Sequence, residues 1–301
     1  MSYQLWTQSY GKGKVRLTKV DREGDVHYLT ELSVDVELDG NFTAAYTEAD
    51  NSMVIPTDTM KNTIYAFARE IDVRELETFA WTLGCHFVES FEHVTQAAVS
   101  VSERAWRRLV VDGEQHPHAF VDGGAEKQTV QAVVLKPSEP GEDPDGALES
   151  GLEGLAVLKT TNSGFSDFLR DEFTTLADTE DRIFATTISA SWIYNEEPDD
   201  WRAVRARIRA TLLREFGARF SPSVQATMYE MSQAVLDAEP AVEEITLTMP
   251  NQHRLLVDLS PFELDNPNVV FMPVDEPHGN ISAGFCREHP EQDHDGHGDE
   301  A

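Results

Sequence analysis

The hydrophobic and polar positions along the chain follow two alternating periods. Between residues 26 and 38, apolar side chains mostly alternate with polar ones, as in a strand with one buried face. Between residues 73 and 91 they return every three or four positions, as in an amphipathic helix. The same criteria predict, in the first half of the chain, strands at 15–20, 26–38, 94–101, 107–111, 119–121 and 129–135 and helices at 58–69 and 73–91.

A Pro-, Gly- and acid-rich stretch, residues 137–152, predicts a linker in the middle of the chain. After it, the order of strands and helices repeats. We expect strands at 155–159, 183–194, 243–249 and 254–258 and helices at 199–217 and 222–237. The predicted order in both halves is strand, strand, helix, helix, strand, strand.

The two halves also share a short run of letters. Residues 60–65 (MKNTIY) match residues 224–229 (VQATMY), with the Thr and the Tyr identical, which we take as support for a duplication. Thr57 and Ser221 are favourable N-caps for the two helices concerned, and helix N-termini attract anions. We predict an α+β protein of two tandem ββααββ units, with antiparallel sheets backed by helices: residues 1–140, residues 141–285, and an acidic, His-containing tail at 286–301 that we expect to be disordered.

Length and composition indicate a globular protein. With 301 residues, of which 40% are hydrophobic, the chain can bury a substantial core. It has no apolar run long enough to span a membrane, and its first residues lack a signal-peptide pattern. Cys85 and Cys286 are far apart and in no C-x-x-C pattern, and the last three residues are not Ser-Lys-Leu. We therefore expect a cytoplasmic protein without a disulfide framework or a cysteine zinc site.

Charge is the most unusual bulk property. The chain has 54 acidic and 24 basic residues, which gives a formal net charge of −30. Such a chain repels phosphates, so nucleic-acid binding is disfavoured. An acidic surface adapted to salty surroundings explains the charge, and lineage composition is the alternative; neither assigns chemistry to a residue.

Residues 157–187 carry the most informative chemistry. A loop of small polar residues, 160–164, leads to Phe165, and Arg182 opens a β-branched run further along. An aromatic face and a guanidinium fork suit a flat, anionic, nitrogen-rich ring, because the face stacks and the fork donates two parallel hydrogen bonds. Without further context, the same two residues are also ordinary for a core Phe and a surface Arg.

The whole segment, LKTTNSGFSDFLRDEFTTL followed by EDRIFATT, closely resembles the corresponding segment of urate oxidase (uricase). The resemblance extends from Tyr10 to about Gly279. Its other motifs are YGK (10–12), TDTMKNT (57–63), HPHAF (116–120), SVQATMY (223–229), PNQH (250–253), VDLSPF (257–262) and DEPHG (275–279). The resemblance implies two tandem T-fold domains and a homotetramer with active sites at subunit interfaces.

The resemblance also implies the reaction and the catalytic residues. Family members oxidise urate with O2 and water to 5-hydroxyisourate and hydrogen peroxide, without metal or cofactor. The implied relay is Lys12, Thr57 and His253: Lys12 draws protons through the Thr57 hydroxyl, and His253 positions the lysine.

Six further residues are implied to bind the substrates. Phe165 stacks on the purine, and Arg182 pairs with one edge of the ring. Gln225 and the backbone N–H of Val224 bind the opposite edge. Asp58 contributes its backbone amide, and Asn251 holds O2 and then the attacking water together with Thr57.

Some alternatives stay open from the residues alone. Lys12 lies in a glycine-flanked turn that is also typical of a solvated surface lysine, and Asn251 and His253 also suit an exposed loop. His116 and His118 form an H-x-H pair without a third ligand nearby in the sequence, so we predict no metal site.

Two other functions compete with the resemblance. One is a pterin-type T-fold enzyme, but such enzymes anchor their ring with a glutamate where this chain has Gln225. The other is a non-catalytic purine-binding protein of the same fold. Gln252 and Arg254 depart from the family pattern, in which Lys and an aromatic residue are frequent, and this leaves the orientation of His253 open.

Overall fold

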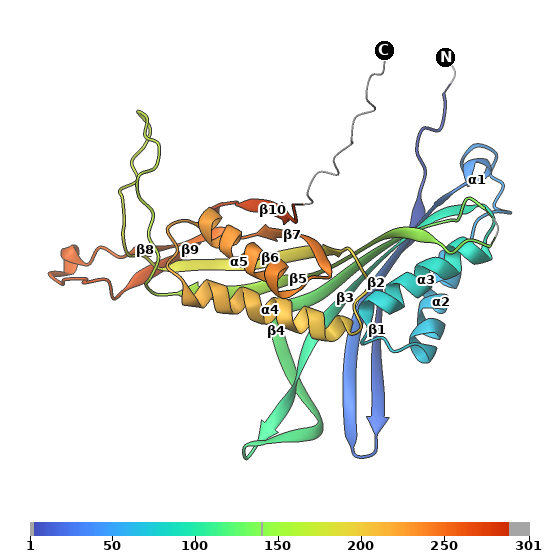
Figure 1. Ribbon diagram of the computed structural model, residues 1–301, viewed down its shortest axis with the longest axis horizontal. Coiled ribbons are helices and arrows are strands. Elements are labelled where there is room, and N and C mark those ends of the chain that lie inside the picture. The colour runs from blue at the N-terminus through green and yellow to red at the C-terminus, as the bar shows by residue number, and fades with distance from the viewer. Residues whose placement is uncertain (1–2, 140, 289–301) are drawn as a thin grey trace, which may run out of the picture.

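The computed structural model describes residues 3–139 and 141–288, so most of the predicted tail, 289–301, lies outside the described residues. The described residues form one ten-stranded antiparallel sheet, with two pairs of long helices packed on it (Figure 1). The α+β prediction is confirmed. Within the described ranges, no helix is long and apolar enough to cross a membrane.

The first repeat runs from β1 to β4. Its elements are β1 (Tyr10–Glu23), β2 (Val26–Gly40), the short helix α1 (Thr43–Thr47), α2 (Thr57–Glu70), α3 (Leu76–Ser90), β3 (Val94–Val111) and β4 (Glu114–Leu135). The elements of the second repeat are β5 (Asp145–Lys159), β6 (Phe184–Tyr194), α4 (Trp201–Ala218), α5 (Val224–Ala238), β7 (Val242–Thr248), β8 (Asn251–Leu256), the 3-10 turn η1 (Ser260–Phe262), β9 (Phe271–Gly279) and β10 (Ser282–Cys286). The second repeat follows the same order, with β10 as its fourth sheet strand and with β8, η1 and β9 inserted between β7 and β10.

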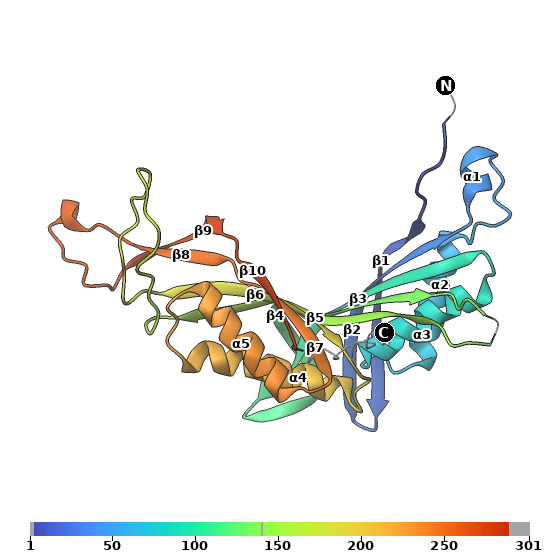
Figure 2. The same cartoon turned by 45° about the horizontal axis from the view of Figure 1, so that its top comes forward.

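The strand order is β1-β2-β3-β4-β5-β6-β7-β10, and β8 pairs with β6 and β9. The two repeats are joined edge to edge, because β4 pairs with β5 from Lys127 opposite Glu153 to Leu135 opposite Asp145. Each repeat nevertheless has its own hydrophobic core. Figure 2 shows the two helix pairs side by side along the sheet, one pair for each repeat.

The four short strands predicted between residues 94 and 135 are in fact two long ones, β3 and β4. Their ladder shifts register twice between residues 104 and 110. Outside the core, this hairpin is exposed or only half-buried on both faces, so its sequence lacks the clean alternation that marks a strand. The sequence pattern therefore predicted four separate segments and missed the stretches at 102–106, 114–118 and 122–128 that join them into two strands.

The predicted linker, 137–152, is wrong at its C-terminal end, since β5 begins at Asp145. The acidic and glycine residues from Asp145 onward lie in a strand that pairs with β4. Position 146 requires glycine, because a Cβ there would lie 1.9 Å from the Val133 carbonyl oxygen. Close backbone approach, and not chain flexibility, explains this glycine.

The letter match at 60–65 and 224–229 does not join equivalent helices. The matching letters lie in α2, which is the first long helix of the first repeat, and in α5, which is the second long helix of the second repeat. Both runs do place the same positions inward, since Met60 and Ile64 are fully buried and so is Met228. The match therefore reflects a shared amphipathic pattern, whereas the duplication is carried by the order of the elements.

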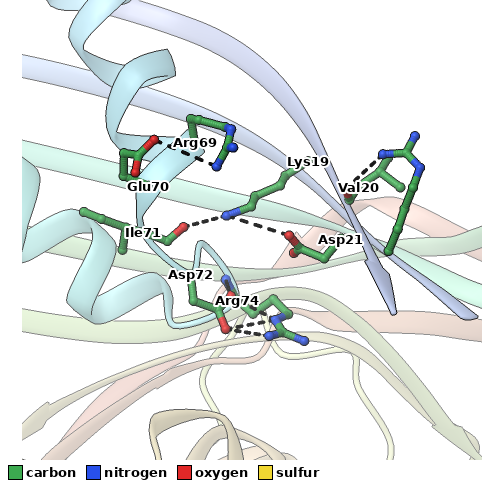
Figure 3. A network of polar contacts seen from close by, with 9 residues as sticks. Lys19, Val20, Asp21, Arg69, Glu70, Ile71, Asp72 and Arg74 are labelled. Atoms are coloured by element: carbon green, nitrogen blue, oxygen red, sulfur yellow. Dashed lines mark hydrogen bonds and ion pairs between the residues drawn. The ribbon is translucent and has the colours of Figure 1, made fainter. Parts of the chain in front are cut away.

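Strand β1 is fixed to the far end of α2. Lys19 Nζ donates to the carbonyl oxygen of Ile71, the residue that ends α2, at 2.7 Å, and lies 3.9 Å from an Asp21 carboxylate oxygen (Figure 3). In the following turn, the Arg74 guanidinium donates to both carboxylate oxygens of Asp72, from Nε to Oδ1 at 2.8 Å and from Nη2 to Oδ2 at 2.7 Å. The Lys19 bond thus ties the first strand to α2, and the Arg74–Asp72 contact stabilises the turn between α2 and α3.

Candidate active site

One cavity of about 300 Å³ gathers six of the nine predicted site residues. It lies where the connection between β5 and β6, the start of α5 and strand β8 meet, at one end of the molecule (Figure 1). The six predicted residues that line it are Phe165, Arg182, Val224, Gln225, Asn251 and His253. Residues from distant parts of the chain thus face the same space.

Backbone hydrogen bonds hold the loop that carries Phe165. The Phe165 N–H donates to the Thr179 carbonyl oxygen at 2.7 Å, and the Thr179 N–H donates back at 2.9 Å. The Arg182 N–H donates to the Ser163 carbonyl oxygen at 2.8 Å, and the Gly164 N–H donates to that of Ser221 at 2.9 Å. One network therefore fixes the aromatic ring, the guanidinium and the segment before α5 relative to one another.

Arg182 is a half-buried cation, and no acidic side chain in the described part of the chain pairs with it. No carboxylate forms an ion pair with it, and its Nε is buried without a hydrogen bond. Burial lowers the pKa of the guanidinium. Its Cζ lies 5.8 Å from the ring centroid of Phe165 and 5.6 Å from that of the buried Phe184. Because a half-buried cation with an unpartnered, enclosed Nε gains from a counter-charge, this guanidinium is suited to an anionic ligand.

Phe165 is supported from one side. Its ring is stacked on Phe168, with centroids 5.0 Å apart and an interplanar angle of 7°. Phe165 lines the cavity and Phe168 does not. The stack therefore orients Phe165 and leaves part of it available to a planar ligand.

The start of α5 presents two free backbone donors. Ser223 is the N-cap, and its Oγ accepts from the Ala226 N–H at 3.0 Å. The predicted cap Ser221 is wrong, because its buried Oγ accepts from the Thr227 hydroxyl instead. Among the described residues, the N–H groups of Val224 and Gln225 have no assigned acceptor, and both residues line the cavity. Such groups are typical anion ligands.

Strand β8 carries Asn251 and His253. On the neighbouring position, Gln252 Nε2 donates to Thr187 Oγ1 at 3.1 Å and so joins β8 to β6. Arg254 Nη1 donates to the His253 carbonyl oxygen at 2.9 Å. Both departures from the family pattern are thus accommodated, and Asn251 and His253 still line the cavity.

The other three predicted residues do not line this cavity. Thr57 and Asp58 are the first two residues of α2, after the N-cap Pro56, so the prediction that Thr57 is the cap is wrong. Lys61 donates to the Asp58 carboxylate and thereby lowers its pKa, and Lys12 adds a smaller attraction. Lys12 therefore lies near the start of α2. Figure 1 shows β1 and α2 at the opposite end of the molecule from β8.

Sequence reasoning missed several lining residues. Leu176, Thr179 and Ile281 also line the cavity. Thr179 is held at the cavity by its two backbone hydrogen bonds with Phe165, and no side-chain pattern in the sequence reveals such bonds. Ile281 precedes β10, a strand that was not predicted.

The H-x-H pair lies beside a third histidine. The rings of His116 and His118 are 4.6 Å apart, and that of His27 from β2 is 5.6 Å from His118. Within residues 3–139 and 141–288, no group of three or more His, Cys, Asp or Glu side chains is arranged to hold a metal ion.

The tandem ββααββ order and the helices on the antiparallel sheet define a T-fold protein with a cavity suited to a flat anionic ring. The family model for uricase matches residues 8–133 and 148–282, and the chain belongs to the uricase family. The uricase of Arthrobacter globiformis is 43% identical over 290 residues, which cover 96% of this chain and 92% of that protein. The uricase of Danio rerio is 38% identical, covering 92% and 93%. The crystal structure of uricase from Arthrobacter globiformis superposes with a TM-score of 0.87 at 42% identity, over 98% of this chain and 99% of that one.

Proposed function

We propose that the protein is a urate oxidase that converts urate, O2 and water to 5-hydroxyisourate and hydrogen peroxide. One observation carries the proposal: in a cavity of a uricase-family protein, the half-buried guanidinium of Arg182 lies beside the Phe165 ring and has no acidic partner in the described chain. Neither the cavity nor these relatives support a pterin-type or non-catalytic T-fold protein. The reaction uses urate as reductant and O2 as oxidant, and we propose that it needs no cofactor.

In the proposed complex, urate stacks on Phe165 and directs one polar edge to Arg182. Gln225 and the Val224 N–H take the opposite edge. Stacking contributes about 1–3 kcal/mol, and hydrogen bonds to charged groups about 1.5–3 kcal/mol each. Once the entropy cost of association is subtracted, these contributions to the binding free energy correspond to a small ligand bound with a micromolar dissociation constant.

The proposed chemistry starts from the electron-rich urate dianion, which reduces O2 directly. Lys12 takes protons through the Thr57 hydroxyl, and His253 positions the Lys12 ammonium. Asn251 and Thr57 hold O2, and later water, above the stacked ring. The protein contributes position and proton transfer, and the electrons come from the substrate.

The proposed active site is shared between two chains of a homotetramer. Six site residues line a cavity in the second repeat, whereas Lys12, Thr57 and Asp58 lie with β1 and α2 in the first. A relay that joins Lys12 and Thr57 to His253 therefore requires the first repeat of one chain to meet the cavity of another. We propose that Asp58 contributes its backbone amide there, since its carboxylate is engaged by Lys61.

We place this activity in the cytoplasm. Both cysteines, Cys85 and Cys286, are free thiols, as is usual in a reducing compartment.

The test is an assay of the purified protein with urate and air after exhaustive chelation. We expect urate absorbance to fall while peroxide accumulates in equal amount. Activity that returned only on addition of a metal or a flavin would overturn the proposed mechanism.

A further inference from the structure

Tyr10 joins the two chain segments that carry Lys12 and Thr57. Its hydroxyl donates to the Ile55 carbonyl oxygen at 3.2 Å and accepts from the Ile55 N–H at 2.8 Å. Tyr10 precedes Lys12 by two residues in β1, and Ile55 precedes Thr57 by two residues before α2. One side chain thus ties the strand of the lysine to the loop of the threonine.

The loop side of this contact is rigid. The Ile55 side chain is buried in the core of the first repeat. Pro56 follows it with a φ of −56°, fixed by its ring, and its carbonyl oxygen accepts from the Thr59 N–H at 2.8 Å to start α2. A displacement of Ile55 is therefore passed directly to Thr57, whose exposed side chain has no assigned hydrogen bond among the described residues.

The strand side is equally constrained. Lys12 lies opposite Val36, and the ladder between β1 and β2 breaks immediately after it. Gly11 approaches β2 so closely that a Cβ there would sit 1.9 Å from the Val36 carbonyl oxygen. The Tyr10 ring meets Phe42 edge-on, with centroids 4.7 Å apart. The position of Lys12 therefore depends on the short ladder segment that contains Tyr10.

We propose that Tyr10 is a positioning residue for proton transfer: its hydroxyl sets the separation of the Lys12 ammonium and the Thr57 hydroxyl. The inference rests on the proposed function, which assigns the relay to these two residues. Proton transfer requires heavy atoms about 2.6–3.2 Å apart, and a displacement of about 1 Å can cost roughly 100-fold in rate. Lys19 fastens β1 to the other end of α2 (Figure 3), so loss of the Tyr10 contact frees only the end that bears the relay.

The test variant is Tyr10→Phe, which keeps the ring against Phe42 and removes only the hydroxyl. We expect kcat to fall roughly 10-fold, while KM stays within about twofold because Phe165 and Arg182 are untouched. The matched control is Tyr46→Phe, which removes a hydroxyl that donates to the Ser9 carbonyl oxygen at 3.3 Å, beside Tyr10. The control should keep kcat within about twofold of wild type.

The thermal midpoint of both variants is measured alongside the kinetics. If Tyr10→Phe does not fold, Pro56→Ala loosens the same loop from its other side and should give the same selective fall in kcat. A kcat in the folded Tyr10→Phe variant equal to that of Tyr46→Phe overturns the positioning role alone. A wild-type protein that does not oxidise urate overturns the proposed function and the positioning role with it.

Discussion

The guanidinium of Arg205 donates to the carboxylate of Glu77, and both side chains are buried, at 6% and 0% exposure. Glu77 belongs to α3 in the first repeat, and Arg205 to α4 in the second. The other Glu77 oxygen accepts from the Ser150 hydroxyl at 2.6 Å, and Arg205 also donates to the Arg74 carbonyl oxygen at 3.0 Å. This buried, hydrogen-bonded pair joins two repeats whose hydrophobic cores are separate.

Breaking this pair should destabilise the protein strongly. Arg205→Met leaves the Glu77 carboxylate buried without its cation, which costs about 3–5 kcal/mol of the free energy of unfolding. The double variant Glu77→Leu with Arg205→Met removes both charges and should recover much of the loss. Denaturant unfolding of the two variants beside the wild type is the measurement, and equal stability of all three would contradict this role.

Glu103, which lies near Arg205 and Glu77, should lower the stability of the folded protein as the pH rises. Burial raises the pKa of its carboxyl, although Arg205 and Arg202 attract the charged form. A raised folded-state pKa means that stability is fully present below the unfolded pKa of about 4.3 and is lost as the pH rises through the folded value. Glu103→Gln should therefore be more stable than wild type at pH 7, with the difference in thermal midpoint vanishing near pH 4. A difference in thermal midpoint that stayed constant between pH 4 and pH 7 would contradict this role of Glu103.

Binding and chemistry should separate between the two groups of site residues. Arg182→Ala removes charge-assisted hydrogen bonds and should raise KM by about 10- to 100-fold. Lys12→Ala should leave KM nearly unchanged and lower kcat by about 100-fold or more. Steady-state kinetics of the two variants provide the comparison, and a Lys12→Ala kcat near wild type would refute the relay.

Gly164 should be essential to the shape of the cavity. A Cβ at this position would lie 2.9 Å from the Thr179 carbonyl oxygen, which accepts a hydrogen bond from the Phe165 N–H. Gly164→Ala must shift that backbone pair and with it Phe165, so we expect a raised KM with a nearly unchanged thermal midpoint. The matched control is Ser166→Ala, a change at an exposed position of the same loop, and this variant should bind urate as the wild type does. Equal KM values for the two variants would contradict the role of Gly164.

The sequence predicted the fold where local pattern and burial agree. Strand β2 and helix α3 carry one clear apolar face each, and both were found within a few residues. The stretches of the β3–β4 hairpin at 102–106, 114–118 and 122–128 and the first half of β5 were missed, because these segments are held mainly by pairing with neighbouring strands and carry few core residues. Such pairing is a tertiary effect that no local period contains.

The candidate site was predicted unevenly for a similar reason. Phe165 and Arg182 were singled out from their chemistry, and the family motifs added the others. No pattern could show that the Arg182 Nε would be buried without a partner, or that Tyr10 would hold Ile55, since both depend on distant segments meeting. The family resemblance, in contrast, implied sites at subunit interfaces, and Lys12 and Thr57 do not line the cavity of their own chain.

Complementation tests most directly whether each active site is shared between two chains. The inactive variants Thr57→Ala and Arg182→Ala are unfolded, mixed in equal amounts and refolded together. With random pairing, a site draws an intact Thr57 segment with probability one half and an intact Arg182 cavity likewise, so about a quarter of wild-type activity should appear. If both groups came from one chain, no mixture could contain an intact site. Activity that stays at the level of the separate variants, in a mixture shown to have exchanged subunits, would contradict the account.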